Sequence, residues 1–242
     1  MELTSVDNPL VKRLATLVSA SGRRAEGLFL AEGSRLIDGL LSAGWKPTHL
    51  LVRADLPVPE HWPEVIRVSE RVAGKLSQAA TASGYCAAFP MPKPAPLEPA
   101  AGGLVLAGVA DPGKVGTLIR SAAAFGIRHV VLSGGADPFG PKVVQATAGA
   151  LALVHLHQVQ GPHAVQGGAP CCGLVVAGGL PPAALARGPR WLVVGGEANG
   201  IPAEWLTACR ERLTLPMPGG TESLNAAIAG SIAAYLLSVD AG

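Results

Sequence analysis

Three short stretches of the 242-residue chain combine polar side chains with glycine and proline, and each follows a predicted apolar strand. ADPGKVGTLIR, at residues 110–120, carries two cations. GGEANG, at 195–200, carries one carboxylate, and PMPGGTESLN, at 216–225, ends in serine, leucine and asparagine. Glycine-rich turns leave backbone N–H groups accessible, and the start of a helix leaves them unpaired. The third stretch, a glycine-rich turn before a predicted helix, therefore favours a ligand that is bound largely by the main chain.

The first stretch matches a phosphate-binding loop only in part. Residues 108–114 fit the pattern G-x-x-x-x-G-K, yet Val115 stands where such a loop needs the Ser or Thr that binds magnesium. Pro112 also removes a backbone N–H group that would contact phosphate. A nucleotide hydrolase is therefore the least favoured alternative. Asp111 instead predicts a helix N-cap, with Arg120 about two turns further along.

The C-terminal stretch predicts a helix from near Glu222 to Leu237, built almost wholly from small and aliphatic residues. Ser223 and Asn225 fall in its predicted first turn. Gly230 lies in the helix interior, where glycine costs about 1 kcal/mol relative to alanine, and this cost indicates that another element packs very close. An ordinary buried C-terminal helix is the alternative interpretation.

Strands and helices alternate through the second half of the chain. Strands are predicted at 104–109, 129–132, within 151–159, and at 174–177, 191–194 and 213–215, with helices at 115–125 and 142–150. Apolar strands separated by helices are typical of a parallel sheet covered on both faces, with ligands at the carboxyl ends of the strands. His155 and His157 share a face of one strand, but no third ligand is nearby, so edge or surface histidines are favoured over a metal site.

Residues 1–90 predict a separate small α/β or α+β module. Its expected helices are at 10–18, 34–43 and 70–76, and its expected strands are at 28–30, 49–52, 65–68 and 85–89. Lys12 and Arg13 fall on the polar face of the first helix, and Arg23 and Arg24 follow in an expected loop.

A proline-rich segment separates the two patterns. Five prolines fall within residues 90–99, which predicts a stiff, extended linker. We therefore expect domains at 1–90 and 103–242, joined by a linker at 91–102.

Composition is that of a globular protein. Hydrophobic residues make up 49%, charged residues 15%, and the net charge is +2, which excludes a disordered chain. The four cysteines show no C-x-x-C or zinc spacing, so free thiols in a reducing compartment are expected. The N-terminus has no apolar signal-peptide core, and Gly-Gly and Pro-Pro pairs interrupt the apolar run at 171–186. We predict a cytoplasmic protein with no membrane span.

Taken in series, the three polar stretches resemble a known family. DPGKVGTLIRSAAAFGI, LVVGGEANGIPAEW and LTLPMPGGTESLNAAIAGSIA are similar, in this order, to the three motifs of the SpoU (TrmH-like) RNA 2′-O-ribose methyltransferases of the SPOUT class. GGADPFGPKVVQATAGAL, between the first two motifs, also fits. Residues 1–90, with DNPLVKRLATL and GLFLAEGSRLIDGLL, resemble the family's L30e-like substrate-binding domain.

The resemblance implies a fold, a cofactor and an assembly. The expected fold is α/β, with a parallel sheet, helices on both faces and a C-terminal trefoil knot, plus the small N-terminal domain. The expected cofactor is S-adenosylmethionine, the expected partner is RNA, and the expected assembly is a homodimer without metal. The matching cofactor contacts are Gly195, Leu215 and Leu224, with Met217 beside them. Candidate RNA contacts are Lys12, Arg13, Arg23, Arg24 and Lys114.

The resemblance also assigns catalytic positions, namely Arg120, Glu197, Ser223 and Asn225. Arginine is effectively never deprotonated, so Arg120 is expected to clamp a phosphate and stabilise negative charge on the ribose oxygen rather than act as a base. Ser223 and Asn225 are expected to position the hydroxyl group or Arg120, and Glu197 to orient loop backbone or Arg120.

Two positions depart from the family pattern. Lys114 stands where motif one usually has Asn, and Gln145 stands where the middle segment usually has Arg. The main hypothesis is a 2′-O-ribose methyltransferase, with ribosomal RNA favoured over transfer RNA because of the N-terminal module. These departures support one alternative, a non-catalytic RNA-binding protein that has kept the fold and the cofactor and lost turnover.

Overall fold

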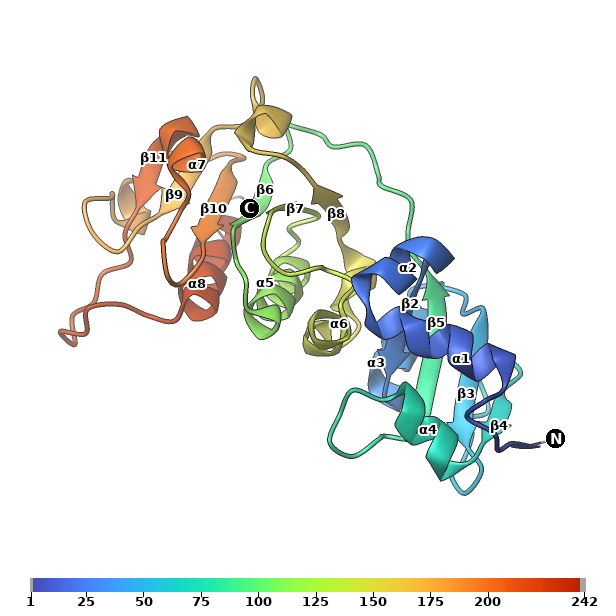
Figure 1. Ribbon diagram of the computed structural model, residues 1–242. Helices are drawn as coiled ribbons and strands as arrows, with labels where there is room; N and C mark the ends of the chain where they lie inside the picture. The colour runs from blue at the N-terminus through green and yellow to red at the C-terminus, as the bar shows by residue number, and fades with distance from the viewer. Residues whose placement is uncertain (1, 240–242) are drawn as a thin grey trace. The chain divides into compact units, whose positions relative to one another are not determined.

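The computed structural model describes residues 2–239 and divides into two compact units (Figure 1). Unit 1 comprises Met1–Lys93 and Phe139–Ala152, and unit 2 comprises Pro94–Pro138 and Leu153–Gly242. Each unit has its own sheet and its own hydrophobic core. A segment from the middle of the chain thus belongs, by its packing, with the N-terminal module.

Unit 1 is built on a five-stranded mixed sheet in the order β1-β4-β3-β5-β2. Its strands are β1 (Glu2–Leu3), β2 (Leu28–Glu32), β3 (His49–Arg53), β4 (Ile66–Val68) and β5 (Tyr85–Pro90). Its helices are α1 (Pro9–Ala15), α2 (Ala20–Glu26), α3 (Ser34–Ser42), α4 (Glu70–Leu76) and α6 (Pro141–Thr147), with the 3-10 turn η1 (Thr16–Val18) after α1. Val11, Leu14 and Leu17 of α1 and η1 are fully buried in its core. The side chains of Asn8 and Ser69 cap α1 and α4, because each accepts a backbone hydrogen bond at the start of its helix.

Helix α2 replaces the loop that was expected around Arg23 and Arg24. Ser19 caps its start, accepting a hydrogen bond from the backbone N–H of Gly22 at 3.0 Å. Gly27 ends the helix with a φ of 64°, a conformation that glycine adopts without strain. The sequence therefore contains both end signals of a helix. The short stretch between them includes a glycine and two arginines and has no apolar pattern, which is why a loop was expected there.

The segment 139–152 is held in unit 1 by close packing. The ring centroid of Phe139 lies 5.5 Å from that of Phe29, which in turn stacks on Phe89 at 5.9 Å. A β-carbon added to Gly39 would lie only 3.1 Å from the Cα atom of Gly149, so two glycines permit a close backbone approach. Sequence order alone gives no sign of this association.

Unit 2 contains a six-stranded sheet in the order β11-β9-β10-β6-β7-β8, in which every pairing is parallel. Its strands are β6 (Gly103–Ala107), β7 (His129–Ser133), β8 (His155–Gln158), β9 (Cys171–Leu174), β10 (Trp191–Gly195) and β11 (Cys209–Leu213). Its helices are α5 (Pro112–Ala124), α7 (Ala203–Ala208) and α8 (Ala226–Val239). The chain builds outward from β6 through β7 to β8 and later returns to place β10 on the other side of β6. The boundary between β6 and β10 is therefore a topological switch point.

Helices cover both faces of this sheet, as predicted. On one face α5 and α8 pack side by side (Figure 1). On the other face, α7 and the 3-10 turn η3 (Pro162–Val165) enclose a core that includes Trp191 and Trp205. A β-carbon on Gly230 of α8 would lie 2.6 Å from Leu118 Cδ2, so the close packing predicted at this glycine is confirmed.

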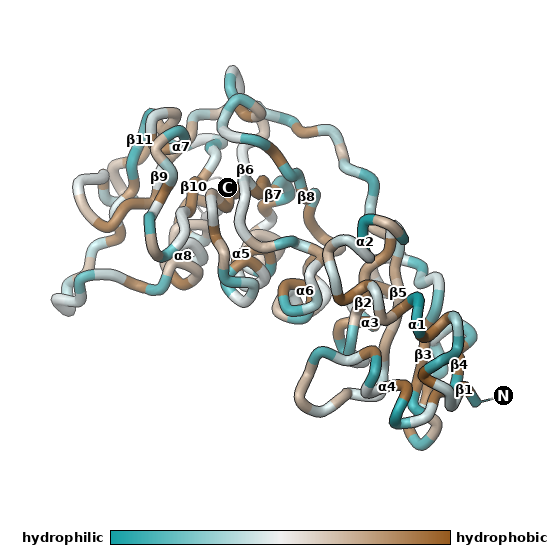
Figure 2. The backbone as a smooth tube through the Cα atoms, in the orientation of Figure 1, coloured by the Kyte–Doolittle hydropathy of each residue, from teal (hydrophilic) through white to brown (hydrophobic). Residues whose placement is uncertain are grey.

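The two edge strands of the sheet, β8 and β11, are more hydrophilic than the strands between them (Figure 2). β8 has the sequence HLHQ and β11 has CRERL. Charged side chains on an edge strand oppose pairing with another chain. The same polarity removed the apolar pattern by which β11 could have been recognised, and the strand expected at 213–215 lies instead at Cys209–Leu213.

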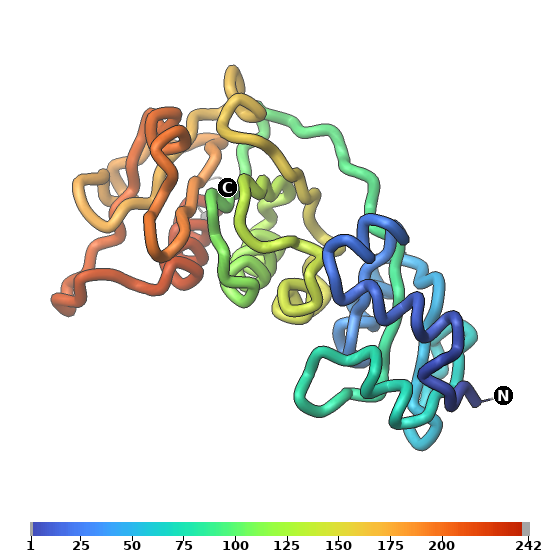
Figure 3. Tube along the Cα trace, in the orientation of Figure 1, coloured from blue at the N-terminus to red at the C-terminus, as the bar shows by residue number. Residues whose placement is uncertain are grey.

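Two further element boundaries differ from prediction. β9 ends at Leu174, so the rest of the strand expected at 174–177 is a connection. Helix α8 begins at Ala226 rather than near Glu222, and the residues before it form a long loop that turns back on itself (Figure 3, the orange-red trace that precedes α8). Pro216 and Pro218 cannot donate backbone hydrogen bonds, which disfavours regular structure there. Among residues 2–239, no helix is both long and apolar enough to cross a bilayer.

Candidate active site

The turn that follows β10 is built on glycines at the switch point. A β-carbon on Gly196 would lie 2.6 Å from the carbonyl oxygen of Gly108, which follows β6. A β-carbon on Gly195 would lie 2.2 Å from the backbone of Gly200, and the N–H of Gly200 donates to the carbonyl of Gly196 at 2.9 Å. Backbone segments therefore approach each other so closely that larger residues would displace the turn.

A cavity of about 500 Å³ lies at this edge of the sheet. Its lining comes from Lys114, 174–176, 194–197, Gly200, Ile201, Leu215, Met217, 223–226 and Ala229. This volume falls within the usual range for small-molecule sites. Backbone and small or apolar side chains dominate the lining, and among residues 2–239 only Lys114 and Glu197 contribute charge.

The cavity brings together seven of the eight residues predicted as catalytic or cofactor-binding. The predicted cofactor contacts that line it are Gly195, Leu215, Met217 and Leu224. The predicted catalytic residues that line it are Glu197, Ser223 and Asn225. Sequence reasoning did not single out 174–176 or Ile201, although 174–176 lies where a strand ends at the carboxyl edge, which is a usable signal.

An ion pair crosses the lining of the cavity. The Lys114 Nζ and Glu197 Oε1 atoms are 2.5 Å apart, and the two side chains are 22% and 35% exposed. The hydrogen bond from Lys114 lowers the pKa of the Glu197 carboxyl below its ordinary value. Lys114 is itself fixed at the start of α5, where its backbone N–H donates to Asp111 Oδ1 at 2.8 Å. The cap predicted at Asp111 is thereby confirmed.

Ser223 and Asn225 precede α8 instead of lying in its first turn. Asn225 acts as a cap, because its Oδ1 atom accepts from the backbone N–H of Ala227 at 2.9 Å. Its carbonyl group accepts from Ala229 N–H at 2.9 Å. Both Ser223 and Asn225 are exposed and line the cavity, so a ligand that enters from solvent has access to them.

Arg120 is not part of the cavity lining. It lies two turns into α5 and is exposed. Its side chain makes no hydrogen bond or ion pair with any residue in the range 2–239. A single chain therefore does not bring this arginine together with the seven residues at the cavity.

The candidate RNA contacts of unit 1 differ in availability. Lys12 pairs with Asp7 at 2.9 Å, and Arg13 pairs with Glu26 at 2.6 Å. Arg24 is exposed.

Arg23, in contrast, is only 4% exposed, and its Nη1 atom donates to the carbonyl groups of Leu17 and Val18 at 2.8 Å. The expectation that Arg23 is an accessible RNA contact is therefore wrong. Its guanidinium group is buried and donates hydrogen bonds to the backbone of η1.

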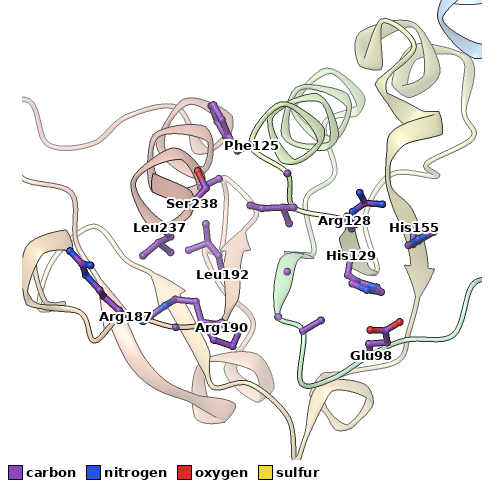
Figure 4. Close-up of a pocket in the computed structure, with 18 residues that line it drawn as sticks. Glu98, Phe125, Arg128, His129, His155, Arg187, Arg190, Leu192, Leu237 and Ser238 are labelled. Atoms are coloured by element: carbon purple, nitrogen blue, oxygen red, sulfur yellow. The ribbon is translucent and has the colours of Figure 1, made fainter. Parts of the chain in front are cut away.

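A second cavity, of about 990 Å³, lies at the opposite, amino end of the unit 2 strands. Figure 4 shows Arg187 and Arg128 on opposite sides of it, with His129 and His155 near Arg128. None of the predicted site residues lines this cavity. His129 Nδ1 and His157 Nε2 are 3.1 Å apart in hydrogen-bond geometry, and burial lowers the pKa of both rings. His157 thus lies on the predicted edge strand, but its side chain is buried.

An all-parallel sheet with a main-chain-lined cavity at its switch point defines an α/β protein that binds a small organic ligand. Residues 103–235 match the SpoU rRNA Methylase family, and residues 8–87 match the MRM3-like substrate binding domain. Because the first match spans more than half of the chain, this protein belongs to the SpoU rRNA methylase family. The resemblance carried by the three motifs is confirmed.

Relatives and solved structures agree with this assignment over nearly the whole chain. The 23S rRNA (guanosine(2553)-2′-O)-methyltransferase RlmP of Bacillus subtilis is 29% identical, over 98% of this chain and 98% of its own. An AdoMet-bound rRNA methyltransferase from Sinorhizobium meliloti is 26% identical with a TM-score of 0.84, covering 98% of this chain and 97% of that chain. An RNA 2′-O ribose methyltransferase structure is 29% identical with a TM-score of 0.82, covering 98% of each chain.

Proposed function

We propose that this protein methylates the 2′-hydroxyl group of a ribose in structured RNA, with S-adenosylmethionine as the methyl donor. The observation that carries the proposal is the cavity at the switch point, where residues from all three motifs converge. Ribosomal RNA is favoured over transfer RNA, because the chain combines the methylase domain with a substrate-binding module along the full length of an rRNA-modifying relative.

The residues around the cavity suit the methyl donor. Its volume and its glycine backbone fit an adenosine-sized group, and Gly195, Leu215, Met217 and Leu224 would hold it. Bound there, S-adenosylmethionine supplies an electrophilic methyl group on a sulfonium. Apolar contacts and main-chain hydrogen bonds fix the orientation of such a ligand without adding net charge.

The polar residues prepare the ribose oxygen. A 2′-hydroxyl group is a weak nucleophile, and Arg120 stabilises the negative charge that develops on its oxygen while clamping the adjacent phosphate. Because arginine holds its proton, the hydroxyl proton passes to a phosphate oxygen of the RNA. Ser223 and Asn225, at the mouth of the cavity, position the hydroxyl group.

A homodimer completes this site. Ile228, Ile232 and Tyr235 recur at helical spacing on α8 and are 51%, 40% and 50% exposed, forming an apolar face that a second copy can cover. Arg120, on the neighbouring helix α5, has no partner in the described part of its own chain. Pairing through this face lets Arg120 of one subunit serve the cavity of the other.

The remaining expectations are part of the same proposal. Residues 1–90 bind RNA through Lys12, Arg13 and Arg24, residues 91–102 link the domains, and residues 103–242 transfer the methyl group. The C-terminal segment forms a trefoil knot. In support, Leu213 O accepts from Val175 N–H, and Thr214 N–H donates to Leu180 O, each at 2.9 Å, so residues 213–214 lie against the connection that follows β9. We place the protein in the cytoplasm.

Methyl transfer from labelled S-adenosylmethionine to unmodified ribosomal RNA and to transfer RNA tests the function. We expect incorporation into ribosomal RNA well above that into transfer RNA. Calorimetry with the cofactor separates the alternative, a non-catalytic family member. Cofactor binding without transfer to either RNA would favour that alternative, for which Lys114 and Gln145 are the supporting departures.

A further inference from the structure

The Lys114–Glu197 pair is the one charged feature among the described residues that line the methyl-donor cavity. Each partner is held by its own element. Lys114 sits in the first turn of α5, anchored by the Asp111 cap, and Glu197 sits on the glycine turn after β10. At 2.5 Å the two groups are in direct contact, and the side chains of Lys114 and Glu197 are 22% and 35% exposed. Neither group is free to leave the cavity wall without breaking the pair.

A charge on the wall of a binding cavity distinguishes ligands of different charge. S-adenosylmethionine carries a sulfonium cation, and S-adenosylhomocysteine, which remains after methyl transfer, has a neutral sulfur in the same position. Glu197 alone would therefore favour the donor over the product, and Lys114 alone would do the reverse. At a separation of about 10 Å, one such charge changes the affinity of a cation by about three- to tenfold.

We propose that Lys114 is a positioning residue whose ion pair with Glu197 cancels the charge of the cavity wall, so that donor and demethylated product are bound without electrostatic preference. The pair also ties the turn at 195–200 to the start of α5, on opposite sides of the switch point. This inference rests on the proposed function, because it concerns the cofactor of that reaction. It also gives Lys114 a role within the cavity in place of an RNA contact, since its ammonium group is engaged by Glu197.

The inference explains why a lysine is tolerated in a cavity that receives a cation. An unpaired ammonium group on the lining would repel the sulfonium, and the carboxylate removes that repulsion. The lowered pKa of Glu197 agrees with this geometry, because it keeps the carboxylate ionised at neutral pH. Asp111, the other nearby acid, is committed to the helix cap and is unchanged in every variant considered below.

The test is the ratio of two dissociation constants, for S-adenosylmethionine and for S-adenosylhomocysteine, measured by calorimetry at low salt. Glu197→Gln should weaken donor binding about three- to tenfold relative to product binding. Lys114→Gln should shift the ratio by a similar factor in the opposite direction. The double variant should return the ratio to the wild-type value. Lys142→Gln and Glu204→Gln, at exposed positions outside the cavity, serve as charge-matched controls that leave it unchanged.

Each outcome discriminates. Opposite shifts in the two single variants support the inference, and a merely structural role would not produce them. Equal changes in donor and product affinity in both single variants would overturn it while leaving the proposed function intact. Wild-type protein that binds neither ligand would instead overturn the proposed function, and the inference with it. Circular dichroism checks the fold of each variant, and because the two substitutions act from different elements, either one alone can contradict the account.

Discussion

Gly230 of α8 faces Leu118 of α5 so closely that a β-carbon at position 230 would lie 2.6 Å from Leu118 Cδ2 and 3.1 Å from Val194 Cγ2. Leu118 is fully buried, so it has little space to move aside. This contact joins two motif-bearing helices to β10, the strand that leads into the cavity. The absence of a side chain at one position thus sets how closely the helices that frame the site can approach.

We expect Gly230→Ala to lower the free energy of unfolding by about 1–3 kcal/mol through overpacking. Urea denaturation measures the change. Gly74→Ala is the matched control, because Gly74 also lies within a helix but has no atom within 4 Å of its added β-carbon. That substitution should stabilise the protein by about 0.5–1 kcal/mol through helix propensity alone. Equal effects at the two positions would show that the close packing at Gly230 is unimportant.

The acid sensitivity of the Lys114–Glu197 pair has a definite sign. The pair lowers the pKa of Glu197 in the folded protein, so its contribution to stability is fully present above the ordinary value of 4.5 and is lost as pH falls through the lowered value. The difference in melting temperature between wild type and Lys114→Gln should therefore be constant from pH 6 to about pH 5 and shrink below that. A difference that grows on acidification would contradict the ion pair.

Substitutions of two neighbouring arginines on α2 should affect different properties, one RNA binding and the other stability. Arg24→Ala should weaken RNA binding and reduce the slope of log affinity against log salt by about 1, with no change in melting temperature. Arg23→Ala should lower the free energy of unfolding by about 1.5–3 kcal/mol, because it removes charged hydrogen bonds to two carbonyl groups. Filter binding at several salt concentrations and thermal melts distinguish them. If Arg23→Ala weakened RNA binding without lowering stability, and Arg24→Ala lowered stability without weakening RNA binding, these roles would be contradicted.

The apolar face of α8 makes the proposed dimer testable. Ile232→Glu places a charge at the centre of the face formed with Ile228 and Tyr235, and we expect the variant to elute as a monomer. Light scattering after size exclusion gives the mass directly. Ser238→Ala, near the end of the same helix, is a control that should remain dimeric. If the Glu variant keeps the wild-type mass, another surface mediates assembly, or the protein is a monomer throughout.

Apolar periodicity carried most of the fold prediction, and its failures have physical causes. A strand was predicted at 174–177, whereas β9 is Cys171–Leu174, because its bounds depend on pairing with β10 and β11, which are distant in sequence. β11 escaped notice because an edge strand with alternating charges lacks an apolar pattern. α8 starts late because Asn225 serves as its cap and not as part of its first turn.

Much of the site could be predicted, because each of the three motifs follows directly after a strand. Parallel strands place their carboxyl ends at one edge, which is why Gly195, Leu215 and Ser223 could be expected to meet. Charge alone misled in one place, since Arg23 is buried and bonded to backbone carbonyls. No sequence pattern indicates that Phe139 packs against Phe29, because that contact depends on the packing of a whole unit.

The most direct test maps the methyl group on the RNA itself. Wild-type protein, labelled S-adenosylmethionine and unmodified ribosomal RNA are incubated, and the RNA is then hydrolysed with alkali, which cannot cleave beside a 2′-O-methyl ribose. The account predicts label in alkali-resistant dinucleotides from one position, reduced at least about 100-fold by Arg120→Ala with cofactor affinity unchanged. Label confined to alkali-labile mononucleotides, as base methylation would give, or full transfer by the Arg120 variant, would contradict it.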